Sequence, residues 1–263
     1  MSMLLQSVRR ASLPGTLACI VLASFAPACG SDAPSTPAPA PPPAPPAPAP
    51  APPPAPLPAP EPECPAAATY TVTFRAVWNA SSHGDQPPFP TGAHFSRVVG
   101  AAHAPGVSFW SSGGIATPGI ESMAETGSVS SLCREIDEEA GRGGSTTCVR
   151  GSQSSFPSPG SVSLSFEATD EHPLVTLVSM IAPSPDWFVG VSGMPLMEDG
   201  CWQERIEVAL VGYDSGTDSG ATFTARNADV TPHEPIGLIQ ELPADVREEP
   251  FAELTLSLVE EPG

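Results

Sequence analysis

The amino-acid sequence predicts an all-β sandwich with short helices, and two observations carry this prediction. Short segments that alternate apolar and polar residues recur along the chain after residue 64, and turn residues separate them. Alternation with a period of two is typical of strands with one buried face, and several such strands at regular spacing indicate a sandwich. The roughly 200 residues from Cys64 onward suit one domain of this kind.

The strands are expected where the alternation is clearest. The predicted strands are residues 70–78, 161–168, 174–182, 206–212, 221–225 and 251–259. Two short helices are predicted at 119–127 and 131–141, because apolar residues recur there at helical spacing. Turn residues make 83–92 a loop between the first strand and the rest of the domain.

The N-terminal residues have the features of a signal for export. Arg9 and Arg10 precede an apolar run at 17–25, and small residues follow it. The run is too short to span a bilayer comfortably, so the pattern predicts a secretory signal peptide over residues 1–28. Cys29 resembles a bacterial lipoprotein cleavage site, which predicts a membrane-anchored lipoprotein at the cell envelope; ordinary cleavage and secretion is the alternative.

A proline-rich segment separates Cys29 from the predicted domain. Residues 34–65 contain 18 of the chain's 36 prolines, and most of the other residues are alanine. Proline lacks the amide donor that a helix requires, so the segment is expected to be an extended polyproline II spacer. We therefore assign residues 29–63 to a lipidated cysteine and a proline- and alanine-rich linker, which would hold the domain away from a membrane as a stalk.

The charge of the chain excludes one class of partner. Acidic residues number 29 against 10 basic ones, and every basic residue is arginine. From Cys64 onward, 26 acidic residues oppose 8 arginines, a formal balance of −18. A field of this sign repels phosphate backbones, so we do not expect binding to nucleic acid.

Three aspartates on two predicted loops suggest a metal site. Asp186 follows Pro183-Ser-Pro, while Asp214 and Asp218 bracket Ser-Gly-Thr. Carboxylates suit a hard cation with oxygen ligands, Ca²⁺ before Mg²⁺. The alternative is that these aspartates only stabilise turns, because their side chains bond nearby backbone amides. The spacing does not match an EF-hand loop.

The sequence gives little support for catalysis. The five histidines are scattered, and neither a zinc-protease HExxH motif nor a Gly-x-Ser-x-Gly elbow is present. We therefore expect no enzyme. A secreted metal-dependent hydrolase that uses His94 or His103 with Asp186 is the competing hypothesis.

The cysteines of the predicted domain are even in number. Cys64, Cys133, Cys148 and Cys201 remain once Cys19 and Cys29 are assigned to the export signal and the anchor. Four cysteines in an exported chain predict two disulfide bonds, for which three pairings are possible. Zinc is not expected, because no paired CxxC spacing occurs.

Five stretches, in order, resemble the spondin N-terminal domain (F-spondin domain) family, and together they cover about residues 64–240. They are residues 70–78, 94–103, 119–127, 183–190 and 214–220. By this resemblance the chain is identified as a bacterial, lipoprotein-type member with its domain at 64–263. The family's fold is a C2-like antiparallel β-sandwich with a calcium site at one end. Its calcium-ligating aspartates match Asp186, Asp214 and Asp218, although Ser215 stands where the family has alanine.

The resemblance also implies a disulfide pairing and a function. The family links its beginning to the loop after the Pro-Ser-Pro-Asp-Trp stretch, which favours Cys64–Cys201 and leaves Cys133–Cys148 as the second bond. The implied function is a calcium-binding adhesion or binding module at the cell surface or in the periplasm. Its ligand, a protein or a glycan, is not named by the sequence.

Overall fold

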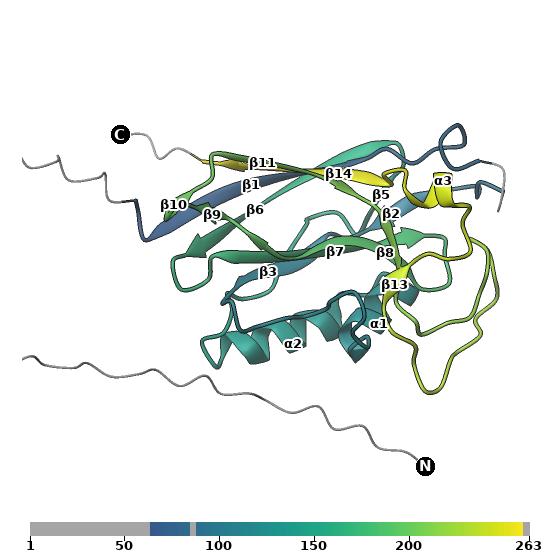
Figure 1. Cartoon of the computed structure of the whole chain (residues 1–263), viewed down its shortest axis with the longest axis horizontal. Coiled ribbons are helices and arrows are strands. Elements are labelled where there is room, and N and C mark those ends of the chain that lie inside the picture. Colours follow the sequence, from purple (N-terminus) through teal and green to yellow (C-terminus); the bar gives the residue numbers. More distant parts are fainter. Residues whose placement is uncertain (1–63, 85–87, 260–263) are drawn as a thin grey trace, which may run out of the picture. The chain divides into compact units, whose positions relative to one another are not determined.

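The computed structural model describes residues 64–84 and 88–259 (Figure 1). The predicted signal peptide at 1–28, the lipidation site at Cys29 and the linker at 29–63 lie outside the described residues. Within the described ranges, no helix is both long and apolar enough to cross a bilayer.

The first of two sheets has four antiparallel strands in the order β11-β14-β1-β6. Its strands are β1 (Ala67–Ala76), β6 (Gly160–Thr169), β11 (Arg205–Leu210) and β14 (Ala252–Leu258). Along β1 the residues from Tyr70 to Phe74 alternate between fully buried and half-buried side chains. This is the pattern of a sheet with one face in the core, which explains why the alternation in the sequence located these strands.

The second sheet packs face to face with the first and has the order β13-β12-β8-β7-β2-β5, with β3 between β7 and β4. Its strands are β2 (His94–Ser96), β3 (Val99–His103), β4 (Val149–Arg150), β5 (Ser155–Pro157), β7 (Leu174–Ala182), β8 (Trp187–Pro195), β12 (Gly212–Asp214) and β13 (Gly237–Leu238). A separate small hairpin joins β9 (Met197–Glu198) to β10 (Cys201–Trp202). The predicted antiparallel β-sandwich is thus confirmed.

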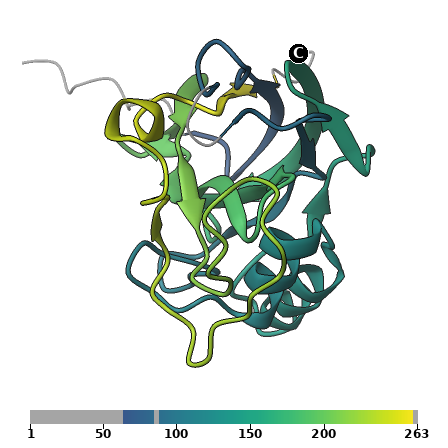
Figure 2. The same ribbon diagram turned by 90° about the vertical axis from the view of Figure 1, so that its right-hand side faces the viewer.

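Helices α1 (Pro118–Thr126) and α2 (Ser130–Ala140) cover the outer face of the second sheet, as Figures 1 and 2 show, and a short α3 spans Ala244–Arg247. Helix α1 begins where the Thr117 side chain accepts a hydrogen bond from the Ile120 amide at 3.2 Å. It ends at Gly127, whose φ of 69° lies in the left-handed region that glycine favours. Both predicted helices are confirmed, and they add a third layer that a two-sheet prediction did not include.

Strand β7 separates two hydrophobic cores. Leu177 and Ile181 face the core between the sheets, whereas Val178 and Met180 face the core under α1 and α2. Every residue of β7 after Leu174 is buried. A strand buried on both faces reads as a continuous apolar run, which is how residues 174–182 appear in the sequence.

Two predicted strands differ from the structure. Residues 206–212 form not one strand but the end of β11 in the first sheet and the start of β12 in the second. Gly212 allows this close crossing, because an added Cβ would meet the Ile239 side chain at 2.4 Å. Residues 221–225 form a turn, in which the Ala225 amide donates to the Thr222 carbonyl, while the buried Phe223 packs against Trp78 and Trp187.

Disulfide bonds join Cys64 to Cys201 and Cys133 to Cys148, with Cα–Cα distances of 5.4 and 5.1 Å. The first ties the start of β1 to the β9–β10 hairpin, and Trp202 beside it donates to the Pro65 carbonyl at 2.7 Å. The second links α2 to the start of β4. Since disulfides persist in oxidising compartments, these bonds indicate an exported domain.

Candidate metal centre

Strands β7, β8 and β12 bring two of the predicted aspartates to one rim of the second sheet. Asp186 lies immediately before β8, and Asp214 is the last residue of β12. Strand β8 is antiparallel to both β7 and β12, so the chain leaves β7 and β12 at the same end of the sheet. In the register, Asp214 pairs with Trp187, the residue after Asp186.

The Asp186 side chain is fully buried and organises the loop that follows β12. Its Oδ2 accepts hydrogen bonds from the amides of Thr217 and Asp218, at 2.8 and 3.1 Å, and from the Ser215 hydroxyl at 2.9 Å. Its Oδ1 is buried without a hydrogen-bond partner. A buried carboxylate oxygen with no donor is costly, and a cation at Oδ1 would offset that cost.

Asp214 is held on both carboxylate oxygens. Its Oδ2 accepts from the Trp187 indole at 3.1 Å, and its Oδ1 accepts from the Gly216 amide at 2.7 Å. Burial, and after it the neighbouring carboxylate of Asp186, raises the pKa of Asp214 to about 7. Two carboxylates in one desolvated region resist being ionised together, and a cation between them would relieve that repulsion.

The loop of residues 214–220, here called the aspartate loop, depends on Gly216. Its φ is 74°, and an added Cβ would meet the Glu234 carbonyl oxygen at 2.2 Å. The Gly216 carbonyl accepts from the Glu234 amide at 2.8 Å, and the Thr217 carbonyl accepts from the Val230 amide at 2.9 Å. The segment that contains Val230 and Glu234 therefore holds the aspartate loop on one side, while the buried Asp186 holds it on the side of the core.

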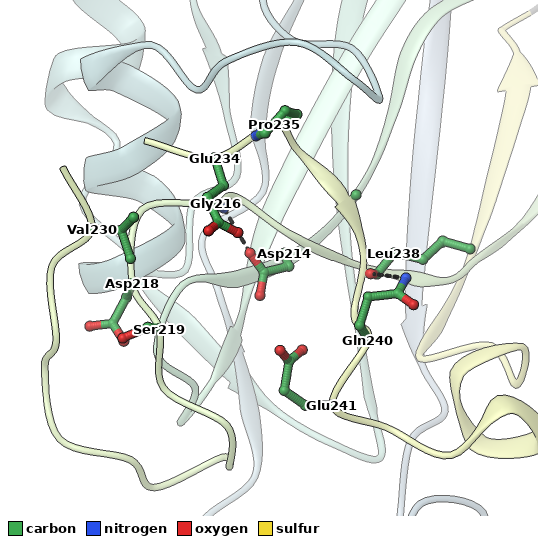
Figure 3. Close-up of a pocket in the computed structure, with 11 residues that line it drawn as sticks. Asp214, Gly216, Asp218, Ser219, Val230, Glu234, Pro235, Leu238, Gln240 and Glu241 are labelled. Carbon is green, nitrogen blue, oxygen red and sulfur yellow. Dashed lines mark hydrogen bonds between the residues drawn. The ribbon is translucent and has the colours of Figure 1, made fainter. Parts of the chain in front are cut away.

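Asp218 contributes its backbone to this arrangement but turns its side chain elsewhere. Its amide donates to Asp186, whereas its carboxylate accepts from the Gly220 and Ala228 amides, each at 2.6 Å. Figure 3 shows the Asp218 carboxylate pointing away from that of Asp214. Among residues 64–84 and 88–259, no group of three or more His, Cys, Asp or Glu side chains is gathered so as to hold a metal ion.

The donors in this region nevertheless suit calcium. Asp186, Asp214 and Asp218 offer carboxylate oxygens, which hard cations prefer, and no histidine or cysteine side chain lines the adjoining pocket. Each oxygen of an ionised carboxylate has about two lone-pair sites. Each carboxylate oxygen of Asp214 and Asp218 accepts one hydrogen bond, so each could still contact an ion. Oδ1 of Asp186 has its whole capacity unused.

Sequence reasoning missed two acidic residues around the site. Glu241 points toward Asp214 across a pocket of about 230 Å³ (Figure 3), and its charge adds to the raised pKa of Asp214. Glu125 on α1 lies near Thr217; burial, followed by the nearby acids Glu121, Asp229 and Asp186, raises its pKa. Glu241 lies far along the chain in a segment without a motif, so no local signal marked it. Glu125 lies within the matched stretch 119–127, which was the one available signal.

His103 and His94, the two histidines of the hydrolase hypothesis, lie at opposite ends of β7. His103 is fully buried, and its ring nitrogens are within 3.0 Å of the Ala104 carbonyl and 2.8 Å of the Thr176 hydroxyl. It pairs with Leu174 at the start of β7, whereas Asp186 follows the end of that strand. His94 pairs with Ala182 at the same end of β7 as Asp186, and its Nδ1 lies 2.7 Å from the Gly92 carbonyl. His103 therefore cannot act with Asp186 in this fold.

Comparison with known proteins gives a consistent result. The Spondin_N family model matches residues 68–259, most of the chain. Spondin-2 of Homo sapiens is 36% identical over 173 residues, which are 65% of this chain and 52% of that protein. Spondin-2 of Rattus norvegicus is 34% identical over 170 residues, 64% of this chain and 52% of that protein.

Spondin-1 of Gallus gallus is 31% identical over 176 residues, which are 64% of this chain but only 21% of that protein. The chain thus spans about half the length of the Spondin-2 relatives and about a fifth of Spondin-1. The match extends through both sheets, the two large helices and the aspartate loop. This chain belongs to the Spondin_N family.

Proposed function

We propose that this domain is an exported calcium-binding module for adhesion or binding, and not an enzyme. The observation that carries the proposal is the buried, unpartnered Oδ1 of Asp186 beside the partly buried carboxylate of Asp214. The resemblance to calcium-binding spondin domains supports the same three aspartates. A cation at this rim would join the start of β8, the end of β12 and the aspartate loop.

Asp186 and Asp214 would hold the ion at the rim, and Asp218 would join them once its carboxylate turns from the Gly220 and Ala228 amides. When bound, calcium supplies positive charge to carboxylates that otherwise repel each other. The chain's own contribution is the frame: Asp186 anchors the aspartate loop, Trp187 orients Asp214, and Gly216 allows the loop to curl. The proposed role of the ion is therefore to make one rim of the sandwich rigid enough to present a binding surface.

Calcium is expected to raise the melting temperature of the domain at pH 7.5. Binding to the folded state alone adds about 2.7 kcal/mol at a free concentration a hundred times Kd. At pH 5 the apparent affinity should fall on the order of a hundredfold, because Asp214, with a pKa of about 7, must lose its proton to bind the ion. Without calcium, the pH dependence of stability has the opposite direction. Because the pKa of Asp214 is raised in the folded state, this residue stabilises the domain most below pH 4, and that stabilisation is lost as the pH rises through 7.

Titration calorimetry and thermal scans with and without a chelator measure both effects. Asp214→Ala should abolish the calcium response and Asp218→Asn should weaken it. Asp245→Asn, an exposed position on α3, is the control and should respond like the parent. Absence of calcium binding at millimolar concentration would refute the proposal.

We further propose that the module is anchored to a membrane through a lipid on Cys29 and stands on the proline-rich linker. The motivation is the signal-like run before Cys29 and the spacer after it. Cys29→Ser should move the exported protein from the membrane fraction to the soluble fraction, as measured by fractionation and immunoblotting. Identical fractionation of variant and parent would instead support secretion of the cleaved chain.

A further inference from the structure

Strand β8 has a second neighbour over only part of its length. On one side it pairs with β7 from Met180 to Leu174. On the other side β12 pairs only with Trp187, Phe188 and Val189, because the chain reaches β12 by crossing from β11 in the first sheet. Among the described strands, none pairs with residues 190–194 on that side. Five residues at about 3.3 Å each leave about 16 Å of strand edge.

This open edge borders a cleft of about 540 Å³, here called the β8–β11 cleft. Val191 and Met194 of β8 line one wall, and Val208 and Leu210 of β11 line the other. Trp110 and Tyr213 also line it, with their ring centroids 4.9 Å apart in an edge-to-face arrangement. The cleft thus combines apolar walls with a strand edge whose outward backbone groups have no strand to bind.

The geometry of a sandwich leaves room for one more strand at this place. Strand β11 is itself the edge of the first sheet, so the cleft lies between the edges of two facing sheets. Packed sheets lie about 10 Å apart, whereas neighbouring strands within a sheet lie about 4.8 Å apart. A strand added beside β8 would therefore lie in the plane of the second sheet, alongside β11.

The charge of the domain selects the kind of segment that would enter. The chain from Cys64 onward carries a formal balance of −18 and contains no lysine. A net charge of this sign favours cationic partners over acidic ones. The hydrophobic side chains that line the cleft favour apolar side chains, and the net negative charge of the domain favours basic ones. The complementary segment therefore alternates apolar side chains, which enter the cleft, with basic side chains, which face outward.

We propose that the β8–β11 cleft binds an extended, cationic segment of a partner protein, which adds to β8 as a further strand. Main-chain hydrogen bonds to residues 190–194 supply affinity, and the apolar walls select alternate side chains. This inference rests on the proposed function as a binding module and gives that module the site and the chemistry of its partner. It does not depend on the calcium site.

The test uses the exported full chain and an end-blocked peptide, Arg-Val-Arg-Val-Arg-Val, in titration calorimetry and hydrogen exchange. We expect saturable binding and slowed amide exchange within residues 190–194. The same peptide built from glutamate and valine should not bind. Two further versions carry N-methyl groups on either the valine or the arginine amides. Only one set of alternate amides faces β8, so one version should bind at least about tenfold more weakly while the other binds like the parent.

A variant that fills the cleft supplies the matched comparison. Val208 is half-buried, faces inward with Leu210 and lines the cleft, so Val208→Trp should abolish binding while thermal unfolding shows that the domain still folds. Ser161→Trp, on the exposed face of β6 at the opposite edge of the first sheet, should leave binding unchanged.

Failure of the parent to bind the basic peptide overturns the inference, as does binding without slowed exchange at 190–194 or equal weakening by both N-methylated versions. A concentration-dependent dimer that protects the same residues without peptide would assign the cleft to a second copy and also overturn it. Loss of the calcium response with intact peptide binding would refute only the proposed function.

Discussion

Replacing Cys64 and Cys201 together by serine is expected to destabilise the domain by about 5 kcal/mol. The two residues are separated by 137 positions, and the entropy gained by an unfolded chain on losing a crosslink grows with the length of the closed loop. Small domains are stable by about 5–15 kcal/mol, so this single change would remove a large part of the total. The hydrogen bond from the Trp202 indole to the Pro65 carbonyl does not involve the cysteines and should persist in the variant, so we expect the effect to arise mainly from the greater entropy of the unfolded chain.

The second disulfide bond provides the internal control. Cys133 and Cys148 are 15 positions apart, so their replacement by serine should cost about 3 kcal/mol. Urea unfolding of both double variants, followed by tryptophan fluorescence, measures the two losses. A larger loss for the Cys133/Cys148 pair than for the Cys64/Cys201 pair would show that native packing around α2, not chain entropy, dominates.

Asp186→Ala is expected to be among the most destabilising single substitutions in the domain, by about 3–5 kcal/mol. It removes the acceptor of the Thr217 and Asp218 amides and of the Ser215 hydroxyl. These donors lie on buried residues, and each buried donor without a partner costs about 1–3 kcal/mol. Because they belong to the aspartate loop, its attachment to β8 should be lost even without metal.

Asp186→Asn separates the structural role from the proposed metal role. Its amide oxygen can still accept from the aspartate loop, so we expect a smaller loss of stability than in Asp186→Ala. The negative charge is gone, so the calcium response should vanish with it. Chemical unfolding in chelator compares the two variants, and calorimetry with calcium follows the metal. An Asn variant that binds calcium like the parent would remove Asp186 from the proposed ligands.

Local pattern carried much of the fold. Residues 174–182 form β7 with the predicted bounds, and both large helices lie within one residue of their predicted starts. These elements have a hydrophobic period that one segment reveals by itself. The break between β11 and β12 at Val211 has no such signal. It depends on Gly212, where a larger residue would clash with the side chains of Ile239, Phe251 and Ile181, which are distant in the sequence. The turn at 221–225 was mistaken for a strand because Phe223 is buried by packing and not by pairing.

The candidate site was likewise predictable only in part from the sequence. Asp186, Asp214 and Asp218 were selected by their turn positions and by family resemblance, and the structure places Asp186 and Asp214 at one rim. What spacing could not show is that the Asp218 carboxylate bonds the Gly220 and Ala228 amides. It also could not show Glu241, which approaches Asp214 from a segment 27 positions later. Side-chain direction and long-range approach depend on tertiary packing, which a single sequence does not record.

The double burial of β7 makes the order of its residues unusually strict. Inserting one residue near its middle would turn every following side chain to the opposite face, so residues shaped for the space between the sheets would enter the space under the helices, and the reverse. Because β7 contributes side chains to both hydrophobic cores, α1 and α2 cannot detach without exposing one face of the second sheet. We therefore expect the helices and the sandwich to unfold as one cooperative unit, with the amides of β7 among the last to exchange.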